Sequence, residues 1–432
     1  MIVTSLVLLA IILLLLASGI WVAISLLAAG VVGLAFFTAA PAGSLLASAM
    51  WDASWSWALT ALPLFVWMGE ILTRSRLSRD MFAGVSPWVG RLPGRLLHVN
   101  ILSCGIMAAV SGSSAVTAAT IGRMSLPELA KRGYDERMMI GTLAGSGTLG
   151  LLIPPSIVMI VYGVTAQQSV ARLFIAGILP GLLLVALFMG YVAVWAMLHR
   201  GRMPIADPPV PLRRKIWEAR RLIPVLLLIV LVIGSIYGGI ATPTEAATIG
   251  VVGSLILAAL GRTLTLASFV DGLMAATRMS CMIALIIAAA ACLTIAVGFL
   301  DIPRALASWV DALGLSSWGL LAVLAVCILV MGCFLEGISI IVLSASVMLP
   351  MVQAAGIDLL WFGIFVVILI EAAQITPPVG FNLFVLQSLT GRDIWRVTAA
   401  TIPFFLLLML LLVLITVAPG IVTWLPERMI AR

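Results

Sequence analysis

The chain has 432 residues, of which 63% are hydrophobic and only 9% are charged, whereas a soluble domain carries about 25% charged residues. This composition excludes a soluble globular protein and predicts one integral domain in a lipid bilayer. The formal charge of +7 does not indicate a nucleic-acid partner, because the basic residues lie in loops between apolar segments, where they set the orientation of the chain.

Ten apolar windows predict membrane crossings, each of which needs about 20 apolar residues. The first window has no preceding Lys or Arg and no cleavage pattern, so it is predicted to be a span rather than a signal peptide. In chain order the windows are 2–17, 20–37, 58–73, 137–166, 171–198, 222–240, 244–261, 281–300, 360–390 and 394–421.

Two further apolar segments, 95–128 and 318–351, are each interrupted near the middle. The first is broken by Ser111-Gly112-Ser113-Ser114 and the second by Glu336-Gly337. Each segment could be a re-entrant hairpin or a pair of short crossings.

An internal repeat relates the two halves of the chain. The pattern Leu-Pro, five residues, Gly, one residue, Asp, eighteen residues, Pro-Pro begins at Leu126 and again at Leu349. Every member of the second copy follows its counterpart by 223 residues, as Pro377 follows Pro154. The same offset relates the spans and hairpins of the two halves. We therefore predict one repeat at 1–198 and a second at 222–432.

A basic linker at 199–221 joins the repeats; it could be a partner surface, although a solvated loop is favoured. Five crossings and one re-entrant hairpin per half would insert the second half upside down, an arrangement typical of secondary transporters. Nineteen of the 24 Lys and Arg fall on one side, which the positive-inside rule assigns to the cytoplasm. Arg123 lies within a hairpin, and the other side holds Arg172, Arg304, Arg428 and Arg432. Both termini are then predicted outside, and the asymmetry favours hairpins over extra crossings.

Each half carries a Pro-Pro pair inside a predicted span, at Pro154-Pro155 within 137–166 and at Pro377-Pro378 within 360–390. Such a pair removes two backbone donors and disfavours helix at the preceding residue, so it breaks the span and frees carbonyl groups. In lipid these groups must be buried in protein or line a cavity. Carbonyls suit Na⁺, and the N-terminus of a half-helix suits an anion. A kinked helix is the alternative, but two pairs at repeat-equivalent positions favour a binding site.

The remaining polar groups at membrane depth are few. Three hydroxyls at 111–114 within a hydrophobic stretch predict ligand contact, and Glu336 occupies the repeat-equivalent position of Ser113. An ionisable group at that depth is a functional candidate. Glu70, Glu245 and Glu371 are the other carboxylates inside or at the ends of spans. The sequence has no Walker motif, which predicts no ATP hydrolysis on this chain, and its two histidines are too few for a catalytic cluster.

Four motifs together resemble the large membrane subunit of the TRAP (tripartite ATP-independent periplasmic) transporters. They are Ser-Gly-Ser-Ser at 111–114, Lys-Arg-Gly-Tyr-Asp at 131–135, Gly-Thr-Leu-Gly-Leu-Leu-Ile-Pro-Pro-Ser at 147–156 and Thr-Pro-Pro-Val-Gly-Phe-Asn-Leu-Phe-Val at 376–385. The resemblance implies a scaffold and a mobile transport domain, which holds both hairpins and both broken helices and moves as an elevator.

The resemblance also implies a function. It implies Na⁺-driven import of an organic anion, such as a C4-dicarboxylate or a sialic acid-like sugar acid, across the bacterial inner membrane. The implied partners are a small membrane subunit and a periplasmic solute-binding protein. A stand-alone Na⁺/carboxylate symporter of the same fold is one alternative. A polytopic membrane enzyme or scaffold is another, although the sequence offers no polar catalytic cluster for an enzyme.

The family's Na⁺ sites lie at the hairpin tips and broken helices. Carried over to this chain, the expected Na⁺ ligands are Ser111, Ser113, Gly145, Thr148, Glu336, Gly337 and Thr376. The residues expected to contact substrate are Ser111, Gly112, Ser113, Ser114, Pro154, Pro155, Ser156, Pro377, Pro378 and Asn382. Two positions depart from the family pattern: Arg123 stands where a small or hydroxyl residue is usual, and Glu336 stands where Asp is frequent.

Overall fold

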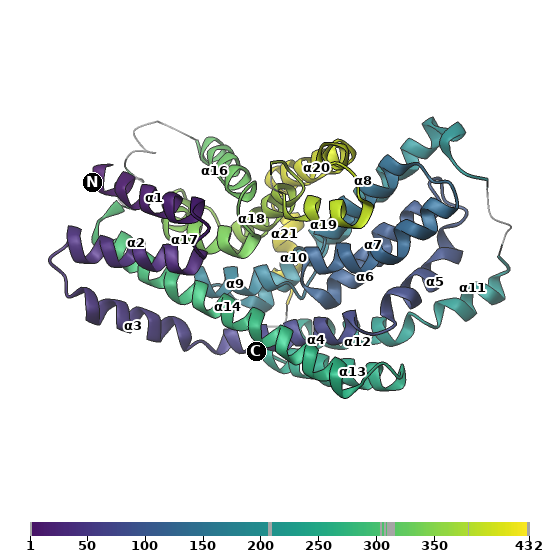
Figure 1. The fold of residues 1–432 in the computed structure, drawn as a ribbon, viewed down its shortest axis with the longest axis horizontal. Coiled ribbons are helices and arrows are strands. Elements are labelled where there is room, and N and C mark those ends of the chain that lie inside the picture. Colours follow the sequence, from purple (N-terminus) through teal and green to yellow (C-terminus); the bar gives the residue numbers. More distant parts are fainter. Residues whose placement is uncertain are drawn as a thin grey trace.

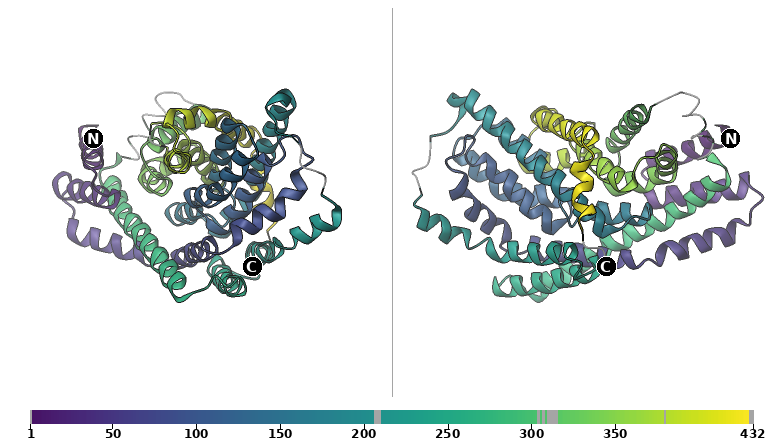
Figure 2. Two further views of the ribbon diagram at one scale, coloured as in Figure 1. Left: turned by 45° about the vertical axis from the view of Figure 1, so that its right-hand side comes forward. Right: turned by 180° about the vertical axis from the view of Figure 1, so that it is seen from behind.

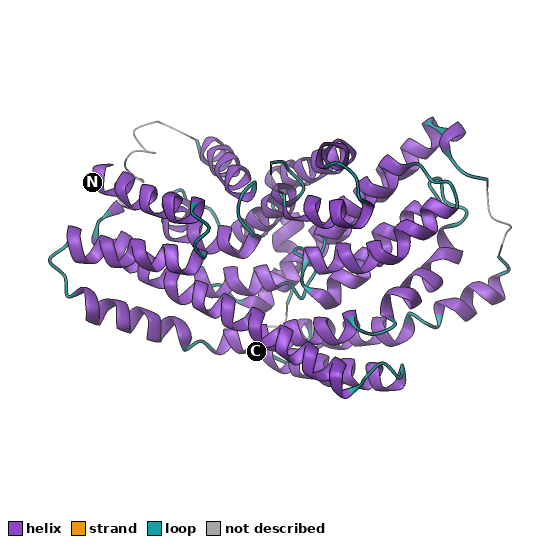
Figure 3. Cartoon of the chain, in the orientation of Figure 1, coloured by secondary structure: helices purple, strands orange, loops and turns teal. Residues whose placement is uncertain are grey.

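The structure is a computed structural model that describes residues 2–205, 210–302, 305, 308, 316–378 and 380–429. Every regular element within these residues is a helix (Figure 3). The predicted all-α class is therefore confirmed. Arg304 and Arg432 of the charge count, and residues 206–209 of the predicted linker, lie outside the described residues.

Five helices precede the first hairpin: α1 (Ile2–Ala17), α2 (Val22–Phe37), α3 (Ala42–Ser54), α4 (Trp57–Thr73) and α5 (Leu77–Val89). The helices α1, α2 and α4 coincide with predicted spans, whereas α3 and α5 were not predicted. Both are too polar to register as apolar windows. Even so, α5 buries Leu77, Met81, Val85 and Val89 at a spacing of four residues, which is the pattern of an amphipathic helix.

The first half continues with α6 (Leu97–Ser111), α7 (Ser114–Lys131), α8 (Glu136–Thr148), α9 (Ile157–Thr165) and α10 (Val170–Leu198). The helices α6 and α7 pack against each other and are separated at the predicted serine-rich break. The chain leaves helical structure between α8 and α9, around Pro154-Pro155. The linker holds the short η1 (Arg200–Arg202) and α11 (Leu212–Ala219).

The second half holds α12 (Ile223–Tyr237), α13 (Pro243–Leu260), α14 (Leu266–Phe299), α16 (Ser317–Gly332), α17 (Gly337–Ala354), α18 (Leu359–Gln374), α19 (Phe381–Thr390), α20 (Ile394–Val417) and α21 (Gly420–Glu427). The helix α14 begins at residue 266 rather than the expected 281. The N-terminal part of α14 carries Asp271 and Arg278. These charges keep this part out of an apolar window, but they do not prevent it from being helical.

The 223-residue offset recurs in the helix bounds. Both ends of α7, Ser114 and Lys131, map onto the two ends of α17, Gly337 and Ala354. The α8 and α18 helices start after repeat-equivalent N-caps, because Asp135 accepts from the Met138 amide at 3.1 Å and Asp358 accepts from the Trp361 amide at 2.8 Å. These two helix pairs therefore keep the offset of the sequence motif, whereas the single helix α14 covers the positions equivalent to α3 and α4.

Five of the described helices are long and apolar enough to cross a membrane, namely α10, α13, α14, α17 and α20. The number becomes seven if α3 with α4 and α11 with α12, each bent by 54°, count as single spans. Six of these seven were predicted as crossings, whereas α17 was predicted as part of the second hairpin. The other four predicted crossings are α1 and α2, at 16 residues each, and the two broken helices. Turns and proline breaks, rather than polar composition, shorten these elements.

Two groups of helices make up the molecule (Figures 1 and 2). In the outer group α14 packs along α2, α3 and α4, and α13 packs on α4. In the central group α6 and α7 pack on α8, and α16 and α17 pack on α18. Contacts of α4 with α6 and α9, and of α14 with α17, join the two groups.

The two halves exchange contacts reciprocally in the central group. The α7 helix of the first half packs on α19 of the second, and the equivalent α17 packs on α9. In the same way α8 packs on α20, and α18 packs on α10. Each hairpin therefore packs against the broken helix of the other half. This packing brings both hairpin tips and both breaks close together.

Candidate functional site

The tip of the first hairpin is a polar turn closed by its own side chains. Ser111 Oγ and Thr117 Oγ1 form a hydrogen bond of 2.7 Å, and Thr117 Oγ1 donates to the Ser113 carbonyl at 2.8 Å. Gly112 has a left-handed φ of 60°. A Cβ at this glycine would lie 2.9 Å from the Pro155 carbonyl oxygen, so the tip touches the first break at a distance that only glycine allows.

The first break runs between Thr148, where α8 ends, and Ser156, the N-cap of α9. Thr148 Oγ1 donates to the Gly145 carbonyl at 2.8 Å, and Ser156 Oγ accepts from the Met159 amide at 3.4 Å. Pro154-Pro155 is a cis peptide bond, as is Pro377-Pro378 in the second break. A Cβ at Gly150 would lie 2.7 Å from the Ser113 carbonyl group, a second backbone contact between this break and the first tip.

The second tip is formed by Glu336, the N-cap of α17, and Gly337. A Cβ at Gly337 would lie 2.7 Å from the Ile370 side chain and 3.5 Å from Gln374 Nε2, so the tip packs on α18 just before the second break. Thr376, in that break, donates its hydroxyl to the Ala372 carbonyl at 2.7 Å. The second tip therefore lies against the second break as the first tip lies against the first.

A small cavity lies where the tips and breaks meet. Its volume is about 30 Å³, measured as the space open to the centres of water molecules. This space holds about two water molecules. The first hairpin contributes Gly112, Ser113, Ser114 and Ala115, and the second contributes Glu336, Gly337 and Ile338. The other lining residues are Leu151 of break one, Ile157 and Val158 of α9, Met279 of α14, and Gln374 and Phe381, which end α18 and begin α19 on either side of break two. A cavity of this size suits an ion or water in the arrangement seen, and a larger anion requires the tips to separate.

Two amide side chains border this region with oxygens that have no hydrogen-bond partner among the described residues. Asn382 Nδ2 donates to Ser114 Oγ, which ties α19 to the first hairpin across the two halves, and its Oδ1 stays unpaired. Gln374 lines the cavity, is 4% exposed and has an unpaired Oε1. Buried amide oxygens without partners can accept a hydrogen bond or ligate a cation.

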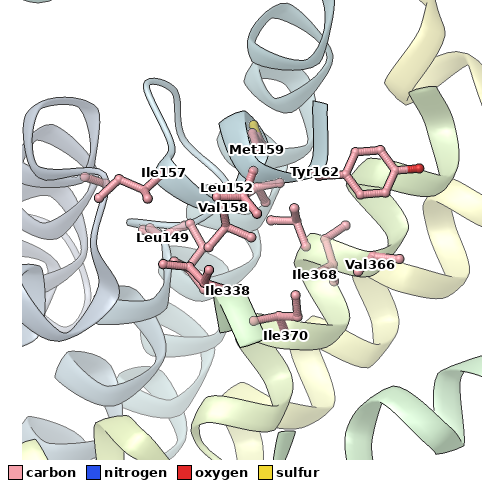
Figure 4. Close-up of a cluster of buried hydrophobic side chains, with 14 of the residues drawn as sticks. Leu149, Leu152, Ile157, Val158, Met159, Tyr162, Ile338, Val366, Ile368 and Ile370 are labelled. Atoms are coloured by element: carbon pink, nitrogen blue, oxygen red, sulfur yellow. The ribbon is translucent and has the colours of Figure 1, made fainter. Parts of the chain in front are cut away.

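A cluster of buried hydrophobic side chains packs next to the site. Figure 4 shows Leu149 and Leu152 of break one, with Val158 of α9, gathered against Ile338 of the second hairpin and Ile368 and Ile370 of α18. Leu149 and Leu152 are fully buried. These contacts fix the first break against elements of the second half, so the two breaks cannot separate without exposing this cluster.

The structure collects some of the predicted residues and separates others. Gly112, Ser113, Ser114, Glu336 and Gly337 line the cavity, and Ser111 and Asn382 are hydrogen-bonded to its rim.

The other predicted residues do not line the cavity: Gly145, Thr148, Pro154, Pro155, Ser156, Thr376, Pro377 and Pro378. Gly145 faces elsewhere, because its Cβ would meet the Phe404 ring of α20 at 2.6 Å. The roles of all these residues as ligands stay predictions.

Eight lining residues were missed from the sequence: Ala115, Leu151, Ile157, Val158, Met279, Ile338, Gln374 and Phe381. The sequence could have indicated Gln374, because its amide is an isolated polar group two residues before Thr376-Pro377-Pro378. Phe381 follows the same motif. Nothing in the sequence indicated Met279, since it lies in the part of α14 that precedes the predicted span.

The helical architecture has a counterpart among solved structures. The chain is similar to the YdaH transporter of Alcanivorax borkumensis, whose crystal structure was described as having an unusual topology. The TM-score is 0.61 over 88% of each chain, at 14% sequence identity, so this likeness concerns the fold. Residues 9–421 match the model of the DctM component of the tripartite ATP-independent periplasmic transporters. The chain belongs to this family and is a multi-pass TRAP transporter large permease.

Curated relatives agree with this assignment. The C4-dicarboxylate TRAP transporter large permease protein DctM of Pseudomonas aeruginosa is 36% identical over 88% of this chain and 89% of its own length. The isethionate TRAP transporter permease protein DctMQ of Oleidesulfovibrio alaskensis is 32% identical over 85% of this chain and 58% of its own length. The ectoine/5-hydroxyectoine large permease UehC of Ruegeria pomeroyi is 29% identical, with 81% and 82% covered.

Proposed function

We propose that this permease couples the inward movement of Na⁺ to the uptake of an organic anion, a carboxylate of the C4-dicarboxylate or sugar-acid type. The observation that carries the proposal is the single cavity shared by both hairpin tips and both breaks. Backbone carbonyls, hydroxyls and the free Gln374 oxygen supply the oxygen donors that Na⁺ needs, and the N-termini of α7, α9, α17 and α19 favour an anion.

The partners and orientation follow from the same proposal. The anion is handed over by a periplasmic solute-binding protein, and a small membrane subunit binds this chain in the bacterial inner membrane. The two halves lie in opposite orientations, both termini are periplasmic, and the central group carries the site across the bilayer as an elevator. A membrane potential supplies about 2.3 kcal/mol per 100 mV for each Na⁺ that enters, which biases the two states.

The proposal is tested by reconstitution with both partners in proteoliposomes. We expect uptake of a carboxylate bound by the partner protein to require an inward Na⁺ gradient. Collapse of the gradient with a Na⁺ ionophore should stop the accumulation. Accumulation that continues after the collapse would contradict Na⁺ coupling, and uptake without the binding protein would favour a stand-alone symporter.

The Na⁺ ligands make a more local prediction. Ser113→Ala at the first tip and Thr376→Val in the second break should each raise the Na⁺ concentration for half-maximal uptake several-fold, because each removes an oxygen ligand. Thr248→Val is the control, since Thr248 Oγ1 also donates to a backbone carbonyl four residues earlier, at 3.0 Å, but in the outer group. Unchanged Na⁺ dependence in both site variants would place the ions elsewhere.

A further inference from the structure

Glu371 is the most deeply buried carboxylate of the described residues. It lies on α18, one turn before Gln374 at the end of that helix, and is 0% exposed. Neither of its carboxylate oxygens has a hydrogen-bond partner among the described residues. The backbone amide of Leu152 in the first break lies close to the carboxyl group, but outside the geometry of a normal hydrogen bond. The carboxyl group therefore sits between the two breaks without a counter-charge.

The helices packed on α18 bring no positive charge to Glu371. These helices are α8, α9, α10, α16, α17, α19, α20 and α21. On α8, Glu136 pairs with Arg392 at 2.5 Å and Arg137 reaches the Ala399 carbonyl at 3.5 Å. On α9, the Tyr162 hydroxyl donates to the Leu359 carbonyl at the opposite end of α18.

The other ionisable groups of these helices are exposed or engaged with different surroundings. Tyr191 of α10 packs on Phe404, and Glu336 lines the cavity at the N-terminus of α17. Cys333 follows α16 and is half-buried, and α19 has no ionisable side chain. The exposed groups are Arg172, Cys327, Asp358, Arg396 and Glu427.

An ionised carboxylate without a partner is strongly disfavoured in such surroundings, since leaving water costs several kcal/mol that nothing nearby offsets. A bound cation is the remaining way to neutralise it. A metal ion needs several oxygen ligands around it, whereas the group of the first break that faces this carboxyl is the Leu152 amide, which is a donor. A proton needs only one carboxylate oxygen.

We propose that Glu371 is a proton-binding site, which holds a proton while the two breaks are packed together and releases it when water reaches the break. The step is a simple association, in which the carboxylate takes one proton and becomes the neutral acid. Because Leu152 belongs to one half and Glu371 to the other, proton binding stabilises the packed junction of the halves. The inference goes beyond Na⁺ coupling and does not depend on it.

The sign of the expected pH effect follows from linkage. By this proposal the packed protein holds the Glu371 proton, whereas a solvated glutamate in an unfolded chain loses its proton above about pH 4.3. The stability that this proton contributes is therefore complete at low pH and is lost as the pH rises. One proton of difference changes the unfolding equilibrium constant up to tenfold per pH unit.

The test compares Glu371→Gln with the unchanged full-length chain in reversible denaturant unfolding from about pH 6 to 8 in K⁺ buffer. Glutamine has nearly the same shape as the protonated acid and cannot ionise. We expect the unfolding constant of the unchanged chain to rise up to tenfold per pH unit relative to that of the variant. Glu245→Gln is the control, because Glu245 is exposed and accepts a hydrogen bond from the Thr242 amide at 2.7 Å, and it should leave the slope unchanged. Parallel slopes for the unchanged chain and Glu371→Gln would overturn the proposal.

Two further measurements keep the proposal decidable. A difference in slope that appears only when Na⁺ replaces K⁺ would assign the carboxylate to a metal ion and overturn the proton. If Glu371→Gln does not fold, infrared spectra of Glu336→Gln decide, since Glu336 is the carboxyl group that lines the cavity. A carboxylic-acid carbonyl band that persists at about pH 8 in that variant supports the Glu371 proton. Absence of the band overturns it.

Discussion

Gly112→Ala is expected to reduce transport by at least about tenfold while leaving a folded protein. A Cβ at this position would lie 2.9 Å from the Pro155 carbonyl oxygen, and the left-handed φ of 60° adds about 1–2 kcal/mol of strain. The first tip must then move away from the first break, which opens the wall of the cavity. Uptake in proteoliposomes and thermal unfolding measure the two effects separately.

Gly133→Ala provides the matched control for this variant. Gly133 also has a positive φ, of 76°, but a Cβ there would meet nothing within 4 Å. It should show a similar loss of stability with nearly unchanged uptake. Equal loss of uptake in the two variants would mean that backbone strain, and not the contact between tip and break, causes the defect.

Asn382→Ala is expected to weaken transport nearly as much. Asn382 is fully buried and donates to Ser114 Oγ, the hydrogen bond that joins the second broken helix to the first hairpin. Loss of the amide leaves the buried Ser114 hydroxyl without this partner, at a cost of about 1–3 kcal/mol. A cost of this size changes the equilibrium constant for packing the two halves together by about 5-fold to 150-fold. Substrate uptake and the unfolding midpoint both report this loss.

A double-mutant cycle identifies the cause. If the hydrogen bond matters, Ser114→Ala with Asn382→Ala should cost about 1 kcal/mol less than the sum of the single changes. Ser388→Ala is the control on the same helix, because its hydroxyl is exposed and donates only to the local Val385 carbonyl. Strict additivity of the two site changes would show that the residues act independently.

Much of the fold was predictable because its signals are local. Pro154-Pro155 and Pro377-Pro378 remove backbone donors wherever they stand, so both breaks were located from the sequence. Both segments predicted as hairpins are helix pairs divided at the predicted breaks, and their re-entrant path stays a prediction, since α17 alone is long and apolar enough to cross a membrane. The amphipathic α5 and the first half of α14 were missed, since a search for wholly apolar windows passes over helices with one polar face or a few charges.

The candidate site was predicted only in part. The tip residues Gly112 to Ser114 and Glu336-Gly337 line the cavity, whereas Gly145 faces Phe404. Neither result follows from the spacing of these residues. Which face of α8 looks toward the cavity depends on how it packs against α20, and that contact joins segments more than 250 residues apart.

The sequence by itself determined that this protein lives in a membrane, that its halves are repeated and where each half is broken. These features depend on apolar runs, on the missing proline donors and on one constant offset, all of which are properties of the linear chain. Only the tertiary structure decided that both tips and both breaks enclose one cavity, that Asn382 reaches Ser114, and that Glu371 lies between the breaks without a partner. These are contacts between elements of different halves, and they depend on how the helices pack together.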